Sequence, residues 1–251
     1  MSPTSAGLKD RALVADLRSL CDRAIAEKRR IPSEPELAAH FGVSRSKLRE
    51  ALARLEHEGA ITRKPRVGIQ PNTALPRPGN RFDLQTDYLT TLAAAGYDAR
   101  VQLVSADIAP ASEELAERLD IEAGAPLLAT RKVWFADGVP AMTAVDRMPV
   151  EPELSVADLD LATSVFRLVE QLAGEPAIWE VTHPSAAGAT ERVAGLLDIE
   201  VGAPCLTLRT LGVSAGGRRL FDSLEHHVPD VVDFGLVRTV VNDPRTDAEE
   251  L

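Results

Sequence analysis

The chain has 251 residues, 45% of them hydrophobic and 26% charged, and it carries a formal net charge of −10. This length and composition are those of a folded protein with room for two domains. No stretch approaches the roughly 20 consecutive apolar residues that a membrane helix needs. Residues 1–5 do not show a basic segment followed by an apolar run, so we expect no secretory signal. We therefore expect a cytoplasmic protein with no membrane partner.

The cysteine content argues against a disulfide framework. Cys21 and Cys205 lie far apart, each in an apolar context, so we expect two buried free thiols. No Cys-x-x-Cys or His-x-x-x-His spacing indicates zinc. Adjacent residues on a strand point to opposite faces, so His226 and His227 cannot both bind one metal ion. We expect neither a metal nor a cofactor.

The net charge is unevenly distributed along the chain. Residues 1–78 carry 15 basic and 9 acidic side chains, a balance of +6, whereas the remainder carries −16. A basic segment on an acidic body indicates that the segment meets a polyanion. The alternative is chance variation between two domains, so the motifs of the basic segment have to decide.

The basic segment begins with an amphipathic helix that ends near residues 28–30. Its apolar face, at helical spacing, consists of Leu13, Leu17, Leu20, Cys21 and Ala24. Polar and charged residues occupy the other face. This pattern predicts a helix that packs against further helices.

A second and a third helix follow, each with a recognisable cap. Ser33 and Glu36 form a capping box at the start of the second helix, and Gly42 suits its end. Ser44 is a good N-cap for a third helix over residues 45–58. Two helices joined by so tight a turn predict a helix-turn-helix, whose second helix lies in the major groove of DNA.

The first turn of the third helix presents side chains suited to DNA. Arg45 and Arg49 are four residues apart and point the same way, opposite the apolar face. Arginine matches the O6 and N7 atoms of guanine, while the hydroxyls of Ser44 and Ser46, with Lys47 beside them, suit phosphate. The alternative is a solvated basic face with no ligand.

A basic hairpin follows the third helix. Residues 60–63 and 69–70 are predicted as two short strands around a turn at 64–68. A helix-turn-helix followed by such a hairpin is a winged helix, whose wing can reach the minor groove or the DNA backbone. The candidate wing contacts are Lys64, Arg66 and Gly68.

These motifs resemble the DNA-binding domain of the GntR family of bacterial transcription regulators, over about residues 8–71. The matching runs are 31–38, 41–45 and 48–52, followed by Leu55, Glu58, Gly59 and Ile61. The resemblance implies that Arg45 and Arg49 read guanines and that Ser44 and Ser46 touch the backbone.

Some positions differ from the family pattern or carry another role in it. Ser33 and Glu34 stand where the family has a Ser-Glu pair, and we expect this pair to cap a helix rather than to read bases. Arg66 and Ile69 replace a Gly and the Thr of the usual wing, and Pro35 stands where Arg is common. The candidate DNA-binding set is Ser33, Glu34, Ser44, Arg45, Ser46, Lys47, Arg49, Lys64, Arg66 and Gly68.

The rest of the chain predicts a second domain in which strands and helices alternate. The expected segments are a winged helix-turn-helix domain at 1–71, a proline-rich linker at 72–81, a second domain at 82–240 and a tail at 241–251. Helices are predicted at 84–95, 111–119, 164–173 and 190–197. Strands are predicted at 100–108, 127–135, 139–148, 177–183, 205–214 and 218–228.

The second domain contains an internal repeat. Residues 119–126 recur at 197–204, 78 residues later, and each copy reads as a helix, a Gly-Ala-Pro turn and two strands joined by a glycine turn. Two such units predict an α+β domain, one antiparallel sheet with helices against it, that has pseudo-two-fold symmetry. The repeated residues themselves are expected to pack and turn the chain rather than to bind a ligand.

This arrangement, over residues 82–238, resembles the UTRA domain, the sensor of the HutC-like branch of the GntR family, whose fold is that of chorismate lyases. The resemblance implies a small-molecule effector between the sheet and its helices. Arg131, Ser164 and Phe166 match the family's binding motif. Arg131 and the helix start at Ser164 suit an anion.

The last predicted hairpin departs from that family. Asp222, Glu225 and His227 stand where the family has Glu, Ser and Tyr contacts. Two acidic residues and a histidine favour a cationic or hydroxylated effector at least as much as a sugar phosphate. Trp134 and Trp179 are expected to be core residues.

Three functions are compatible with parts of this sequence. A homodimeric, effector-responsive regulator, most simply a repressor, would bind double-stranded, pseudo-palindromic operator DNA. An enzyme is the alternative suggested by the lyase fold, but no nucleophile–base pair or metal spacing supports it. An adaptor whose basic domain binds protein fits the +6 charge and the Arg45/Arg49 pair poorly. The sequence therefore predicts a regulator and not an enzyme.

Overall fold

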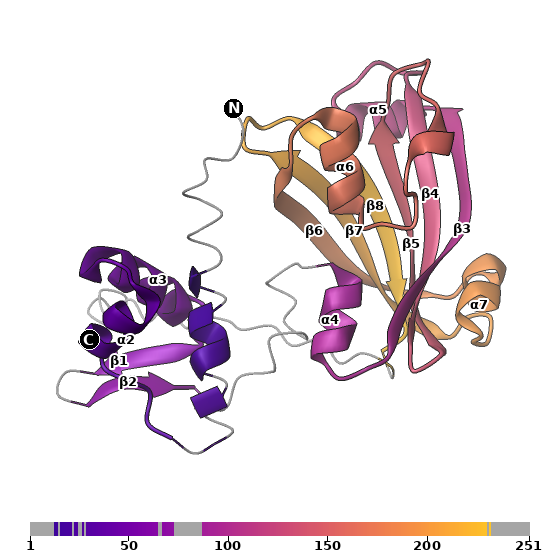
Figure 1. The fold of residues 1–251 in the computed structure, drawn as a ribbon. Coiled ribbons are helices and arrows are strands. Elements are labelled where there is room, and N and C mark those ends of the chain that lie inside the picture. Colours follow the sequence, from indigo (N-terminus) through magenta and orange to yellow (C-terminus); the bar gives the residue numbers. More distant parts are fainter. Residues whose placement is uncertain are drawn as a thin grey trace, which may run out of the picture. The chain divides into compact units, whose positions relative to one another are not determined.

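Figure 1 shows a computed structural model of the chain. It describes residues 29–64, 67–72 and 87–229, Val231, and several positions between 13 and 27. The chain divides into two compact units, one holding the described residues up to Asn72 and the other those from Asp87 onward. Apart from Asn72, the predicted linker and tail lie outside the described residues.

The N-terminal unit is a winged helix-turn-helix, as predicted. Its elements, after helical residues at 13–14, 16–21 and 23–24, are α2 (Glu34–Phe41), α3 (Arg45–His57), β1 (Ile61–Lys64) and β2 (Gly68–Pro71). Gly42 ends α2 with φ of 62°, the left-handed conformation expected at a helix end. The two strands pair as an antiparallel hairpin.

One hydrophobic core joins the helices and the wing of this unit. Leu17, Leu37, Leu48, Leu52 and Leu55 are fully buried in it. Ile61 and Ile69, one from each strand of the hairpin, are buried in the same cluster. The wing is therefore held at a set place beside α3 by apolar contact, and the opposite side of α3 remains exposed.

The C-terminal unit is built on one antiparallel sheet, and its α+β class confirms the prediction. The helices are α4 (Tyr88–Ala94), α5 (Glu113–Leu119), the short 3-10 helix η2 (Val156–Asp158), α6 (Val165–Ala173) and α7 (Glu191–Leu197). The strands are β3 (Ala99–Pro110), β4 (Pro126–Ala136), β5 (Val139–Pro149), β6 (Ala177–Gly188), β7 (Pro204–Ser214) and β8 (Arg219–His227). They lie in the order β3-β4-β5-β8-β7-β6.

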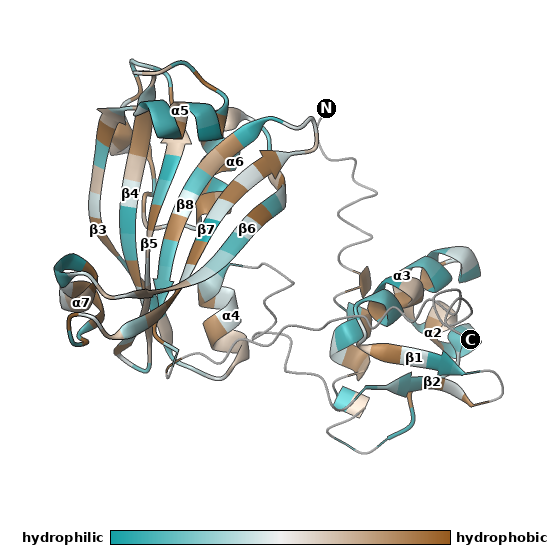
Figure 2. Cartoon of the chain, turned by 180° about the vertical axis from the view of Figure 1, so that it is seen from behind, coloured by the Kyte–Doolittle hydropathy of each residue, from teal (hydrophilic) through white to brown (hydrophobic). Residues whose placement is uncertain are grey.

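Helices cover both faces of the sheet. In Figure 1, α4 and α6 lie on the face toward the viewer, and the reverse view of Figure 2 brings α5 and α7 to the front. Hydrophilic and hydrophobic residues alternate along several strands in Figure 2, as expected where the two faces differ in their surroundings. The α4/α6 face is the one on which a pocket forms.

The internal repeat builds two halves of the sheet that meet at β5 and β8. Strands β3, β4 and β5 form one half, and β6, β7 and β8 form the other. The repeated turns make equivalent hydrogen bonds: Gly124 N–H donates to the Ala111 carbonyl at 2.9 Å, and Gly202 N–H donates to the Ala189 carbonyl at 2.8 Å. The predicted structural role of the repeat agrees with these bonds.

The main difference from the predicted elements is the length of β6. It continues to Gly188, five residues beyond the predicted end at His183, because residues 184–188 pair with β7. Pro184 and the small residues after it read as a loop in the sequence. An edge strand tolerates proline because one side of it has no strand to pair with.

Smaller differences have local causes. Ser112 caps α5, so the helix begins at Glu113 rather than at 111. The 3-10 helix η2 was not predicted. Residues 84–86 of the predicted first helix of this domain lie outside the described residues. Cys21 and Cys205 are buried, as expected, and neither forms a disulfide.

Candidate DNA interface and effector pocket

The recognition helix presents its polar first turn to solvent. Ser44 caps α3 by accepting a hydrogen bond from the Lys47 N–H at 3.2 Å. Arg45, Ser46 and Arg49 are exposed. Arg45 has no hydrogen-bond or ion-pair partner in the described part of the chain, so its guanidinium is available to a ligand.

Arg49 is held by a carboxylate of the preceding helix. Its Nε donates to Glu34 at 3.1 Å, and Arg63 of β1 lies 3.8 Å from the other oxygen of Glu34. Arg63 in turn binds Glu56 of α3 through its backbone N–H and its guanidinium, at 2.7–2.8 Å. Glu34 therefore links the helix-turn-helix to the wing and orients Arg49.

The cap of α2 uses Ser33 and Glu36, as predicted. The backbone N–H and the hydroxyl of Ser33 donate to the Glu36 carboxylate at 2.7 and 2.6 Å. These bonds hold the pKa of Glu36 below its usual value. Ser33 is thus engaged in capping the start of α2, and it is Glu36 rather than Glu34 that completes the cap.

The wing turns between Lys64 and Gly68. Lys64 is exposed at the end of β1, and Gly68 has a φ of 89°, which favours glycine. The Val67 N–H closes the turn by donating to the Lys64 carbonyl at 3.2 Å. Arg66, a predicted wing contact, lies outside the described residues.

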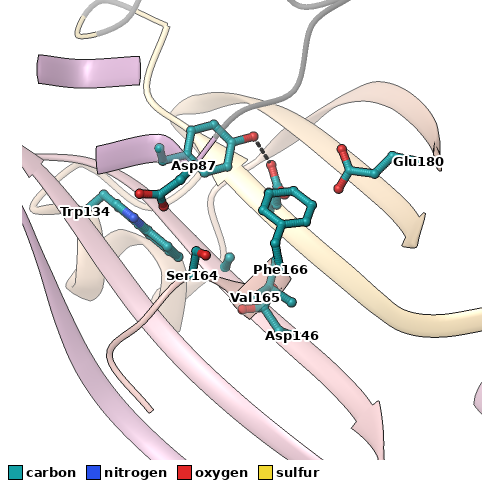
Figure 3. A pocket seen from close by; sticks show the side chains of 10 residues that line it. Asp87, Trp134, Asp146, Ser164, Val165, Phe166 and Glu180 are labelled. Atoms are coloured by element: carbon teal, nitrogen blue, oxygen red, sulfur yellow. Dashed lines mark hydrogen bonds between the residues drawn. The ribbon is translucent and has the colours of Figure 1, made fainter. Parts of the chain in front are cut away.

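In the second unit a pocket opens between the sheet and the N-terminal ends of α4 and α6. The space between its walls, counted together with the open solvent at its mouth, is about 330 Å³, and Figure 3 shows the pocket at close range. The lining residues are Asp87, Tyr88, Trp134, Ala144, Asp146, Ser164, Val165, Phe166, Glu180 and Glu225. Pseudo-symmetric positions meet here, since Asp87 and Tyr88 precede Val165 and Phe166 by 78 residues.

Three of the carboxylates that line the pocket differ in their hydrogen-bond and ion-pair partners. Glu225 accepts hydrogen bonds from the Tyr88 hydroxyl at 2.6 Å and pairs with His227 Nε2 at 2.9 Å. Asp146 accepts from the Ser223 hydroxyl at 2.8 Å. Burial and the negative charges of Glu225 and Asp146 raise the pKa of Glu180 to about 8.

A buried lysine lies beneath the pocket. The Lys132 ammonium, fully buried, donates to the Thr163 carbonyl at 2.6 Å and lies 3.7 Å from Asp146. Burial lowers the pKa of Lys132 and raises that of Asp146, and their mutual attraction opposes both shifts. Lys132 thereby ties β4 to the segment that leads into α6.

Comparisons with known proteins agree with both units. The profile of the bacterial regulatory proteins of the gntR family matches residues 12–70, and that of the UTRA domain matches residues 94–232. The histidine utilization repressor of Pseudomonas putida is 30% identical over 186 residues, which cover 72% of this chain and 71% of that protein.

The chain belongs to the GntR family. Its UTRA domain and its similarity to histidine utilization repressors place it in the HutC-like branch, so it is a DNA-binding transcription regulator with an effector domain and not an enzyme. The transcriptional repressor NagR of Bacillus subtilis is 25% identical over 181 residues, 71% of this chain and 73% of that protein.

Solved structures share the fold of this GntR-family regulator. The possible transcriptional regulator YydK of Bacillus subtilis has a TM-score of 0.70 at 19% identity, covering 90% of this chain and 99% of that one. PhnF of Mycobacterium smegmatis has a TM-score of 0.59 at 23% identity, covering 90% and 100%.

The predicted effector residues of the regulator divide between the two faces of the sheet. Ser164, Phe166 and Glu225 line the pocket, and His227 adjoins it through Glu225. Arg131 lies on the opposite face, because its neighbours Thr130 and Lys132 both contact Asp146 on the pocket face. The structure does not bring Arg131 to this pocket.

Asp222 also lies away from the pocket, because its neighbour Ser223 is the one that bonds Asp146. Fully buried, Asp222 accepts from Arg118 of α5 at 2.6 Å and lies 3.4 Å from Arg147 and from Arg209. It therefore anchors α5 to the sheet, a structural role that its place in the predicted effector set did not anticipate.

Three pocket residues, Tyr88, Asp146 and Glu180, were not predicted from the sequence. Trp134 was expected in the core and is buried in a hydrophobic cluster, 5% exposed, as expected; it also lines the pocket. Trp179, also expected in the core, is 66% exposed, so that prediction was wrong. The 78-residue offset of the repeat could have indicated Tyr88, because it relates the start of the helix that contains Tyr88 to the start of the helix that contains Phe166.

None of the helices in the described part of the chain is long and apolar enough to cross a membrane. The same residues contain no group of three His, Cys, Asp or Glu side chains placed to hold a metal ion.

Proposed function

We propose that two copies of the chain bind a pseudo-palindromic operator, with α3 of each copy in the major groove of one half-site. The observation that carries this proposal is the exposed pair Arg45 and Arg49, on the side of α3 opposite the buried Leu48 and Leu52. Bidentate contact of each arginine with a guanine would supply sequence discrimination. A two-fold dimer matches an inverted repeat.

Contacts with the DNA backbone would come from the ends of the same elements. The hydroxyls of Ser44 and Ser46 and the ammonium of Lys47 surround the N-terminus of α3, which favours phosphate. Lys64, Arg66 and Gly68 belong to the wing, where a basic turn suits the backbone or the minor groove. Ser33 and Glu34 support these elements by capping α2 and holding Arg49.

The effector would bind in the pocket between α4 and α6 and change the affinity for the operator. Ser164, Phe166, Glu225 and His227 are the residues of the predicted set that we retain for this role. Repression, with release of the operator by the effector, is favoured because NagR and the histidine utilization repressors are named as repressors. A regulator of chromosomal genes acts in the cytoplasm.

The domain limits belong to the same proposal. We place a DNA-binding domain at 1–71 and an effector domain at 82–240, joined by a linker at 72–81 and followed by a tail at 241–251. The described residues up to Asn72 and those from Asp87 onward belong to two separate compact units, which supports two domains. Effector binding would then change the spacing of the two DNA-binding domains through the linker.

Selection of genomic fragments by the purified protein, followed by binding to the recovered site, tests the proposal. A palindrome with guanines in each half-site is expected, and Arg45→Ala and Arg49→Ala should each cost about 1–3 kcal/mol of operator binding. Arg54→Ala is the matched control, since Arg54 is on α3 nine residues after Arg45 and pairs with Glu58. Unchanged binding by both variants would refute the proposed readout.

A further inference from the structure

The described lining of the effector pocket is acidic. Asp87, Asp146, Glu180 and Glu225 are four of its ten residues, and the described ten include no lysine, arginine or histidine. Figure 3 shows Asp87 and Glu180 on two sides of the pocket. Lys132, the cation beneath it, is already directed at the Thr163 carbonyl and Asp146.

These carboxylates are not equally compensated by the protein. Glu225 has Tyr88 and His227, and Asp146 has Ser223 and Lys132. Glu180, in contrast, has no hydrogen-bond or ion-pair partner among residues whose placement is described. A partly buried carboxylate without a partner is costly when ionised, and a cation from outside would remove that cost.

The other walls of the pocket are aromatic. Tyr88, Trp134 and Phe166 line it, and the rings of Tyr88 and Trp134 meet edge-on with their centroids 5.9 Å apart. Tyr88 also lies 5.4 Å, centroid to centroid, from His227. Aromatic faces attract organic cations through the negative charge above the ring, most strongly where water is excluded. Carboxylates beside aromatic rings are thus suited to an alkylammonium group.

We propose that the effector is a small organic cation, whose ammonium group pairs with Glu180 and Glu225 and whose carbon chain lies against Tyr88, Trp134 and Phe166. This inference rests on the proposed role of the pocket as the effector site.

An anionic effector fits these walls poorly. The N-terminus of α6 favours negative charge, but the Ser164 hydroxyl there already accepts from the Arg167 N–H at 3.4 Å. A phosphate or carboxylate beside Ser164 would also face the carboxylates of Asp87 and Asp146 with no basic side chain lining the described pocket. Repulsion between like charges in a partly buried site outweighs the partial charge of one helix end.

A series of four-carbon compounds tests the sign of the ligand's charge on the full-length chain. The series has three members: 1,4-diaminobutane carries two positive charges, 4-aminobutanoate has no net charge, and butanedioate carries two negative charges. Trp179→Phe leaves Trp134 as the single tryptophan of the chain, so its fluorescence reports on the pocket. Titrations run above pH 8, where Glu180 is ionised.

We expect the diamine to change Trp134 fluorescence with saturation at or below about 50 mM, and butanedioate to have no effect. Glu180→Gln should weaken diamine binding at least about tenfold, and Glu170→Gln, an exposed neutralisation on α6, should not. Saturation by butanedioate instead, absence of any diamine effect, or equal binding by the two variants would each overturn the proposal.

The same samples separate this inference from the proposed function. Operator binding without any added compound depends on the N-terminal unit and not on the charge of the ligand. A protein that binds its operator but responds to the dianion would refute the cationic effector and leave the regulator intact. A protein that binds the diamine as expected and selects no DNA site would refute the operator proposal alone.

Discussion

The guanidinium of Arg49 and the carboxylate of Glu34 lie 3.1 Å apart on a surface proposed to face DNA. The Arg49 side chain is 70% exposed, so the pair contributes little to folding stability. Its value lies in orientation, because an arginine held through Nε still presents its two terminal nitrogens to a guanine. A carboxylate close to the DNA backbone also repels phosphate and thereby weakens binding to any sequence.

Glu34→Gln should therefore reduce discrimination more than affinity. We expect binding to a scrambled duplex to tighten, and the ratio of operator to scrambled affinity to fall about tenfold, which is about 1.4 kcal/mol. Fluorescence anisotropy with both duplexes at matched salt measures the ratio. Glu50→Gln, an exposed change on α3, controls for loss of negative charge, and an equal ratio in the two variants would contradict the orienting role.

A second prediction for a single residue concerns Glu180 and the pH dependence of folding stability. Its pKa is raised from 4.5 in the unfolded chain to about 8 in the fold, so the folded protein retains a proton that the unfolded chain has released. Stability should fall as pH rises between these values. Glu180→Gln should then be more stable than the parent above pH 8 by about 1–3 kcal/mol, and equal to it near pH 4.

Thermal melts of the effector-free protein across that pH range provide the measurement. Glu170→Gln again serves as the control, because it removes one exposed carboxylate from the neighbouring helix. Parallel curves for the parent and Glu180→Gln would show that Glu180 titrates normally. The carboxylates that face Glu180, namely Glu225, Asp146 and Asp87, and the cation Lys132 are unchanged in both proteins.

At the scale of elements, the two halves of the sheet carry different side chains at the position that lines the pocket. Trp134 of β4 lines the pocket, and 78 residues later the equivalent position in β7 is Gly212. The space over Gly212 is filled by the ring of Phe221 from β8, which is fully buried. The same backbone thus carries an aromatic wall in one half and a packed core in the other.

Gly212→Ala should destabilise the C-terminal unit, because a Cβ at this position would overlap the Phe221 ring. Overpacking of a buried ring costs about 1–3 kcal/mol, measured by chemical denaturation. Gly195→Ala, in α7, is the matched control with the opposite sign, since its Cβ would meet open space and alanine favours a helix by about 1 kcal/mol. A neutral Gly212→Ala would mean that Phe221 can move freely.

The contacts of Asp222 with a helix and with neighbouring strands explain why this residue has a structural role. It lies on β8 in the second half of the sheet and binds Arg118 on α5 in the first half. Arg147 and Arg209, from β5 and β7, approach the same carboxylate. One buried acid therefore holds together strands and a helix from both copies of the repeat.

For the whole molecule, the uneven distribution of charge along the chain bears on DNA binding. The first 78 residues carry +6 and the rest −16, so attraction to DNA should be concentrated in the segment that holds the winged helix-turn-helix. Neutralised phosphates release counterions, and operator affinity should fall steeply with salt. The acidic unit should limit non-specific binding without altering that dependence.

Lys64→Ala tests the wing within this picture. If Lys64 contacts a phosphate, the substitution should weaken binding to operator and scrambled DNA alike, and the slope of log affinity against log salt should fall by about 1. Salt titrations of the parent, Lys64→Ala and Arg54→Ala give the three slopes. A slope unchanged from the parent would remove Lys64 from the interface.

The elements of this protein could be predicted from its sequence because their signals are local. Ser33 with Glu36, Gly42 and Ser44 act within one turn of helix, and the glycine turns of the repeat act within a few residues. The order of helices and strands, the winged helix-turn-helix and the duplicated sheet therefore followed from short runs. The edge strand β6 was underestimated because its last residues become a strand only by pairing with β7.

The composition of the pocket was decided by tertiary structure. Register and alternation place Arg131 and Asp222 on one face of the sheet and Glu225 on the other, and a shift of one residue would reverse them. Glu180 and Tyr88, 92 positions apart in the chain, meet only because the repeat folds about β5 and β8. The sequence determined which segments exist, since local forces select helix, strand and turn. Long-range strand pairing decided which side chains share a site.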